Sequence, residues 1–194
     1  MERTDIRLPV DISDHELNRR WPIIEQLAEL SWARDGRWTE LVTAVRWFAE
    51  ATNAASREDA FLKFAIALDL LLGREEVGYS ETQTTRIGER LGFLLGENDP
   101  TRRWRIFQAL KPLYNTRGGI VHGTTRAAES ELFRMESIAR LAILRMGWEI
   151  RHRHHRNLSA FIDWVRELKF GTPFEEIEVP PFLQLADSWF DERT

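Results

Sequence analysis

Arg117 and His122 lie in the segment YNTRGGIVHG, residues 114–123, with four residues between them. A histidine exchanges protons near neutral pH, and a guanidinium stabilises developing negative charge with paired donors. Side chains of these two types can cleave a phosphodiester by acid-base chemistry. In RNA, a base would remove the proton of the 2′-hydroxyl, and attack on phosphorus would leave a 2′,3′-cyclic phosphate and a 5′-hydroxyl. The structural alternative is that Arg117 caps helix carbonyls or pairs with Asp69, while His122 bonds locally.

The same segment lies inside an acid-free window. Residues 100–128 contain no Asp or Glu, although the formal net charge of the chain is −4. This local excess of cations predicts an anion-binding face. Besides Arg117, the cations expected to contact RNA phosphates are Arg102, Arg103, Arg105, Lys111 and Arg126.

Two glycines directly follow Arg117 and affect how the pair can meet. Two interior glycines destabilise a helix by about 2 kcal/mol relative to alanine, so we expect a kink, cap or break at Gly118 and Gly119. On a regular helix, steps of about 100° rotate His122 about 140° away from Arg117. The pair can then share a face only if the backbone departs from regularity or a second subunit contributes.

The rest of the chain predicts a nearly all-α fold, because apolar residues recur at helical intervals and no convincing hairpin of strands is present. Ser56 with Asp59 is expected to cap the third helix, and Ser80 with Gln83 to begin the fourth. The buried faces expected are Phe61, Phe64, Ala65, Leu68, Leu71 and Leu72 in the third helix, and Ile87, Leu91, Leu94 and Leu95 in the fourth. The apolar positions expected in the core of the fifth helix are Trp104, Phe107, Leu110, Leu113 and Tyr114. The expected helices cover residues 13–33, 38–52, 56–73, 80–96, 101 to the glycines, 127–150 and 157–170.

Composition limits the function classes. At 194 residues the chain suits one domain with a full core, extended by a C-terminal appendage. Without cysteine it has no disulfide or thiolate metal site, and the motifs of P-loop and Rossmann nucleotide binding are absent. We expect no cofactor, no metal, no membrane insertion and a cytoplasmic protein. The cluster RHRHHR, residues 151–156, favours a solvated helix end, with contact to the RNA backbone as the alternative. Arg145 with His152 is a weaker arginine–histidine candidate.

Three blocks of sequence resemble the Apea-like branch of the HEPN superfamily. They are FLKFAIALDLLLG (61–73), RIGERLGFLLG (86–96) and RIFQALKPLYNTRGGIVHG (105–123). The third block matches the family signature Tyr-x-x-Arg-Ser-x-x-x-His-Gly at Tyr114, Arg117, His122 and Gly123. With the flanking helices, the resemblance covers about residues 20–150.

The acidic and apolar composition of residues 171–194 predicts an extension that packs on the domain or on a partner. The resemblance implies a HEPN-like helical bundle over residues 1–170, with additional N- and C-terminal helices. It also implies a homodimer, because a single histidine cannot easily act as base and acid on opposite sides of one phosphorus. Two arginine–histidine pairs in one cleft would form a composite, metal-independent ribonuclease site. Such proteins act as toxins or in antiviral defence, which suggests an antitoxin or effector protein as a partner.

Two positions depart from the family pattern. Gly118 replaces the usual polar residue, and Asp69 stands where the family favours Glu. We assign orienting roles to Asp69, Tyr114 and Asn115. The alternative for Asn115 is helix capping, and the alternative for Tyr114 is a core position with its hydroxyl reaching a partner. A non-catalytic HEPN module that dimerises and binds RNA, a nucleotide or a partner protein is the second hypothesis. A scaffold whose acidic tail recruits an effector is the third.

Overall fold

Every regular element that the structure describes is helical, as the sequence predicts. This computed structural model describes residues 38–75, 81–153 and 155–172, together with Val179 and Leu183. The first expected helix, 13–33, lies outside these residues. The described α-helices are α2 (Thr39–Thr52), α3 (Arg57–Leu72), α4 (Gln83–Gly96), α5 (Pro100–Val121), α6 (Glu129–Arg153) and α7 (Leu158–Lys169).

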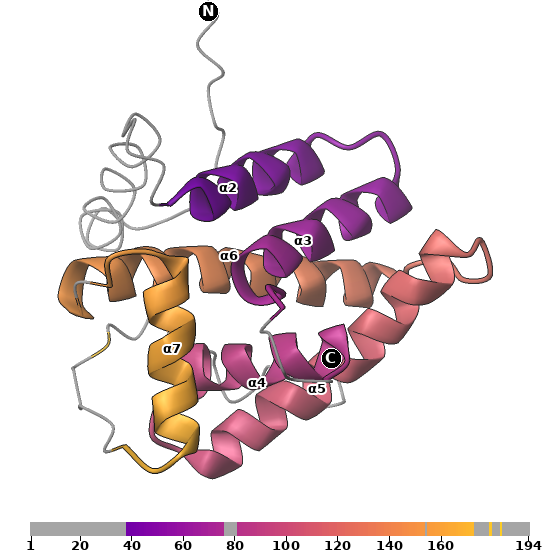
Figure 1. The fold of residues 1–194 in the computed structure, drawn as a ribbon. Coiled ribbons are helices and arrows are strands. Elements are labelled where there is room, and N and C mark those ends of the chain that lie inside the picture. The colour runs from indigo at the N-terminus through magenta and orange to yellow at the C-terminus, as the bar shows by residue number, and fades with distance from the viewer. Residues whose placement is uncertain (1–37, 76–80, 154, 173–178, 180–182, 184–194) are drawn as a thin grey trace, which may run out of the picture.

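The long helix α6 lies at the centre of the arrangement (Figure 1). In that view, α2 and α3 pack together on one side of α6, and α4 and α5 pack together on the other. Helix α6 contacts α2, α3 and α4, and α7 contacts α4. The connection between α5 and α6 lies at one end of the molecule, so the last turn of α5 is placed at the periphery.

Apolar residues at helical spacing form the core where α3, α4 and α6 meet. The predicted buried face of α3 is confirmed, with all its members at most 2% exposed, and so is that of α4. These residues are Phe61, Phe64, Ala65, Leu68, Leu71 and Leu72 of α3, and Ile87, Leu91, Leu94 and Leu95 of α4. The predicted cap of α3 is also confirmed, because Ser56 Oγ accepts a hydrogen bond from the backbone N–H of Asp59 at 3.1 Å.

Two arginines of α4 hold the C-terminal end of α3. Arg90 Nη1 donates to the carbonyls of Leu72 and Arg74, each at 2.7 Å, and Arg86 Nη1 donates to Gly73 O at 2.7 Å. Guanidinium donors satisfy carbonyls that have no partner within the helix, and their charge complements the negative helix end. These contacts fix the last turn of α3 against α4.

A buried ion network joins α6 to the end of α4. Arg145 is 1% exposed and lies 2.9 Å from Glu97 Oε1 and 2.9 Å from Glu149 Oε1. Glu149 Oε2 in turn lies 2.8 Å from Arg153 Nε. Glu97 has a φ of 51°, in the left-handed region that favours glycine, and its ion pair with Arg145 secures this turn. The cluster RHRHHR is therefore not wholly solvated, because the Arg153 side chain is only 4% exposed.

Helix α5 differs from the sequence prediction in two respects. It continues through Gly118 and Gly119 to Val121, and the residue with positive φ that follows its end is Gly123, at 68°. Trp104, expected in the core, is 61% exposed, whereas Ile106 is 1% exposed. The physical reason is rotation: Trp104 lies about 120° around the helix from Leu110, which faces the core.

The described residues beyond α7 include two that are buried. Val179 is 5% exposed and Leu183 is 0% exposed, and both pack in a small cluster with Trp148 and Leu144 of α6. This contact attaches part of the segment 171–194 to α6. Among the described helices, none combines the length and the apolar character that crossing a membrane requires.

Candidate functional site

Asp69 of α3 joins two residues of α5. The Tyr114 hydroxyl donates a 2.7 Å hydrogen bond to Asp69 Oδ1, and Arg117 Nη2 donates to Asp69 Oδ2 at 3.3 Å. Tyr114 and Arg117 are one helical turn apart, so both reach the carboxylate from the same side of α5. The side chains of Asp69 and Arg117 are 16% and 31% exposed, respectively. The carboxylate is therefore mostly enclosed, while the guanidinium keeps a solvent-accessible part.

The surroundings of this cluster shift the pKa of two of its groups. Burial raises the pKa of Asp69 above its ordinary value, although hydrogen bonds from Tyr114, Arg117 and Gln83 act in the opposite direction. Burial, followed by the charge of Asp69, raises the pKa of Tyr114 well above its ordinary value. Tyr114 therefore stays protonated at neutral pH and acts as a hydrogen-bond donor to the carboxylate.

Gln83 is a member of the cluster that the sequence did not indicate. Its side chain donates a hydrogen bond to Asp69 from the first turn of α4. The sequence pattern suggested instead that Gln83 completes a capping box with Ser80, whereas the structure shows Thr82 as the N-cap of α4. Only the packing of α4 beside the end of α3 reveals the contact, so no local pattern could have identified it.

His122 and Arg117 do not share a face of α5. His122 is the C-cap residue, and its backbone N–H donates to Gly118 O at 3.1 Å, so the backbone remains helical between the two residues. The regular turn separates their directions by about 140°. Arg117 points toward Asp69, and His122 is exposed at the end of the helix.

The two glycines of this segment have different surroundings. A Cβ atom on Gly118 would meet no heavy atom within 4 Å, whereas one on Gly119 would lie 2.6 Å from Thr125 Cβ. Gly119 O also accepts the backbone N–H of Thr124 at 2.9 Å. Gly119 therefore allows the chain after α5 to fold back closely, and Gly118 leaves an open position beside Arg117.

The predicted RNA-binding cations differ in their exposure. Lys111 and Arg126 are exposed, whereas Arg102, Arg103 and Arg105 are half-buried. Arg103 lies over the ring of Phe93 at 3.9 Å and donates to Glu97 O at 2.5 Å, so part of its hydrogen-bonding capacity serves the fold. Burial, opposed by the charge of Asp99, lowers the pKa of Arg103 from its ordinary value.

No protein-family model, curated protein or solved structure matches the chain significantly.

The weaker arginine–histidine pair has little access to a ligand, because Arg145 is 1% exposed and occupied by Glu97 and Glu149. His152, its partner in that spacing, stacks on Trp148 with ring centroids 4.2 Å apart. Asn115 is exposed on the outer side of α5.

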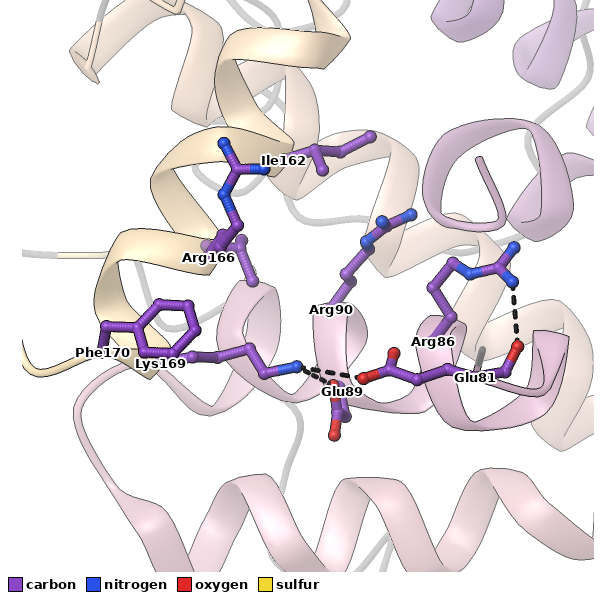
Figure 2. Close-up of a pocket in the computed structure, with 9 residues that line it drawn as sticks. Glu81, Arg86, Glu89, Arg90, Ile162, Arg166, Lys169 and Phe170 are labelled. Carbon is purple, nitrogen blue, oxygen red and sulfur yellow. Dashed lines mark hydrogen bonds and ion pairs between the residues drawn. The ribbon is translucent and has the colours of Figure 1, made fainter. Parts of the chain in front are cut away.

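A small hollow lies between α4 and α7 (Figure 2). Lys169 extends across it to two carboxylates of the α4 region, at 2.5 Å from Glu89 Oε2 and 3.5 Å from Glu81 Oε1. Burial lowers the pKa of Lys169, but the hydrogen bonds and charges of both glutamates outweigh that effect and raise it. The hollow is therefore occupied by an ion-paired cluster that fastens α7 to α4.

The cluster of α3, α4 and α5 offers a positioned cation for an anionic ligand. Asp69 orients Arg117 while leaving part of the guanidinium open, and His122 supplies a proton-exchanging group at the nearby helix end. A carboxylate that fixes a guanidinium reduces the freedom lost when a phosphate binds. The chain provides both groups, but directs them to different sides of α5.

Proposed function

We propose that the protein is a metal-independent endoribonuclease of the HEPN type, active as a homodimer. The observation that carries the proposal is the Arg117 guanidinium, held at 3.3 Å by Asp69 and 31% exposed, on a helix without acidic residues that ends at an exposed His122. The match to the Tyr-x-x-Arg and His-Gly positions of the HEPN signature supports the same reaction. A role in toxin activity or antiviral defence belongs to this proposal.

The divergence of Arg117 and His122 supports a composite site, because a second copy of the chain can supply the group that one copy directs elsewhere. One His122 takes the proton of the 2′-hydroxyl, and the oxygen forms a bond to phosphorus. The bond from phosphorus to the 5′-oxygen breaks, and the imidazolium of the second His122 gives a proton to that oxygen. The two Arg117 guanidiniums stabilise the charge on the equatorial phosphate oxygens.

The deciding experiment incubates the protein with labelled single-stranded RNA in EDTA and analyses the product ends for cyclic phosphate. His122→Ala should lower cleavage about 10²- to 10⁴-fold, with helicity and dimerisation unchanged. Arg117→Lys keeps the charge but removes the paired donors, so it should also lose most activity. His152→Ala changes another exposed histidine and serves as the control. Full cleavage by His122→Ala would refute the proposal.

A non-catalytic HEPN module is the second candidate, and the open position at Gly118 favours it. The family usually has a polar residue there, and Gly118 leaves that space empty beside Arg117. Gly118→Ser fits without a clash and adds a hydroxyl next to the guanidinium. A wild-type protein that binds RNA without cutting it, together with a Gly118→Ser variant that cuts, would identify a module that has lost cleavage through this position.

A further inference from the structure

The outer face of α5 carries a line of exposed side chains that the core does not use. They lie at positions that repeat with the helix and fall within an arc of about 60°. We call this set the outer stripe; it consists of Trp104, Gln108, Lys111, Asn115 and His122. Gly118 lies in the same line, between Asn115 and His122, and adds no side chain to it.

One end of the outer stripe is an exposed aromatic platform. The Trp104 indole is 61% exposed and stacks on the Phe107 ring, with centroids 5.6 Å apart and an interplanar angle of 11°. Phe107 in turn lies against Gly88, where an added Cβ would come 2.7 Å from the ring. The indole is therefore supported from beneath by a ring packed on α4, and its remaining surface faces solvent.

The other members of the outer stripe are polar or cationic. Gln108 and Asn115 carry amides that donate and accept hydrogen bonds, and Lys111 adds a positive charge. Helix α5 has no Asp or Glu, so its charge complements a polyanion. A coiled-coil partner would require apolar residues along the whole line, and Lys111 of a second copy would repel its equivalent across a two-fold axis.

We propose that a single-stranded RNA segment lies along the outer stripe, with a base stacked on Trp104 and a phosphate beside Lys111. This inference rests on the proposed function, because it specifies how the substrate of that site is held. Aromatic platforms combined with a cationic track are the features that bind single strands without sequence preference. Trp104 and His122 are 18 residues apart, which corresponds to about 27 Å of helix, or about eight nucleotides of a stacked strand.

Binding can be measured separately from cleavage with a fluorescein-labelled 2′-O-methyl oligouridine of twelve nucleotides, which lacks the attacking hydroxyl. By fluorescence anisotropy, Trp104→Ala should weaken binding about 5- to 150-fold. Phe170→Ala removes another exposed aromatic, 77% exposed and beyond α7, and should leave the affinity unchanged. Lys111→Gln should lower the slope of log affinity against log salt by about one. Circular dichroism checks that the helicity of each variant is preserved.

Cleavage of short RNA provides a second readout. A tetranucleotide cannot span from the His122 end to Trp104, so Trp104→Ala should raise KM much more for a twelve-nucleotide RNA than for a tetranucleotide. Equal binding of the 2′-O-methyl probe by Trp104→Ala and Phe170→Ala would overturn the outer stripe as the RNA track. Conversion of a dimer to a monomer by Trp104→Ala, with unchanged affinity per subunit, would also overturn it and assign the stripe to self-association.

Failure of the proposed function would look different. In that case the wild-type protein would yield no cyclic phosphate from unmodified RNA, although Trp104→Ala would still weaken binding of the 2′-O-methyl probe. That result supports the outer stripe as an RNA-binding surface and rules out the proposed ribonuclease activity. If the protein cleaves a long RNA and Trp104→Ala does not change that cleavage, the ribonuclease activity is supported and the outer stripe is ruled out as the RNA-binding surface.

Discussion

Tyr114 and Asp69 are joined by a 2.7 Å hydrogen bond that links the centre of the bundle to the candidate site. Tyr114 is 6% exposed, so its hydroxyl has little access to water and depends on the carboxylate as a partner. The same carboxylate holds Arg117 at 3.3 Å. A change at Asp69 therefore affects both the stability of the bundle and the orientation of the guanidinium.

Asp69→Asn should change how stability depends on pH. Because burial raises the pKa of Asp69 above its ordinary value of 3.8, the carboxyl group favours the folded state most when it is protonated. This contribution is fully present below the ordinary value and is lost as pH rises through the raised pKa. Urea denaturation across this range should show the free energy of unfolding of the wild type falling relative to that of Asp69→Asn. If the free energy of unfolding of the wild type rises relative to that of Asp69→Asn, the carboxyl group of Asp69 is not buried.

Gly118→Ala and Gly119→Ala form a matched pair with opposite expected effects. At Gly118 the new methyl group meets open space, and higher helix propensity should stabilise the protein by up to about 1 kcal/mol. At Gly119 the methyl group would overlap Thr125, so we expect destabilisation by about 1–3 kcal/mol. Urea denaturation measures both values. Equal effects would show that the chain after α5 does not fold back on Gly119.

Arg145→Met should be strongly destabilising, because it leaves Glu149, itself 1% exposed, with one of its two cations removed, and it also removes the partner of Glu97. Breaking one side of a buried ion pair costs about 3–5 kcal/mol. Arg140→Met is the control on the same helix, since Arg140 pairs with Glu136 at 2.7 Å and both side chains are partly exposed. There the expected loss is about 0.5 kcal/mol. Similar melting temperatures for the two variants would disprove the assignment of Arg145 as the residue that joins α6 to the end of α4.

His155→Gln should remove part of the acid sensitivity of the fold. Burial, followed by the charge of Arg153, lowers the pKa of His155 from 6.5 to about 4. A group whose pKa is lowered by folding contributes stability above the unfolded pKa and loses it as pH falls through the folded pKa. The free energy of unfolding of the wild type should therefore fall between pH 6.5 and 4, and His155→Gln should flatten this decline. If the free energies of unfolding of the wild type and His155→Gln fall in parallel as pH is lowered, His155 is not buried next to Trp164.

Local sequence signals were sufficient for several elements of the fold. The spacing of Phe61, Phe64 and Leu68 identified the buried face of α3, and Ser56 identified its beginning. Such signals suffice because periodic apolar residues and a capping side chain act within a few residues of one another. The hydrogen bond from Tyr114 to a partner was also expected, because a buried tyrosine hydroxyl requires one.

The sequence alone could not predict which side of α5 faces the core or which residues form the site, because both depend on how the helices pack. Trp104 and Ile106 are both apolar, and only the packing of α4 and α5 shows that Ile106 faces inward and Trp104 outward. The glycines suggested a break because intrinsic propensity disfavours them in a helix. The close approach of Thr125 to Gly119, which no local pattern reveals, leaves no room for a larger side chain there.

The two sides of α5 differ in how well they should tolerate substitution. Leu110 and Leu113 on the inner side are at most 2% exposed, so most replacements there would weaken the whole bundle. Side chains such as Gln108 and Asn115 make little contribution to packing, and a protein lineage can exchange them without losing the fold. Single substitutions along the exposed side can therefore change its charge and hydrogen-bonding groups, while the scaffold beneath stays constant.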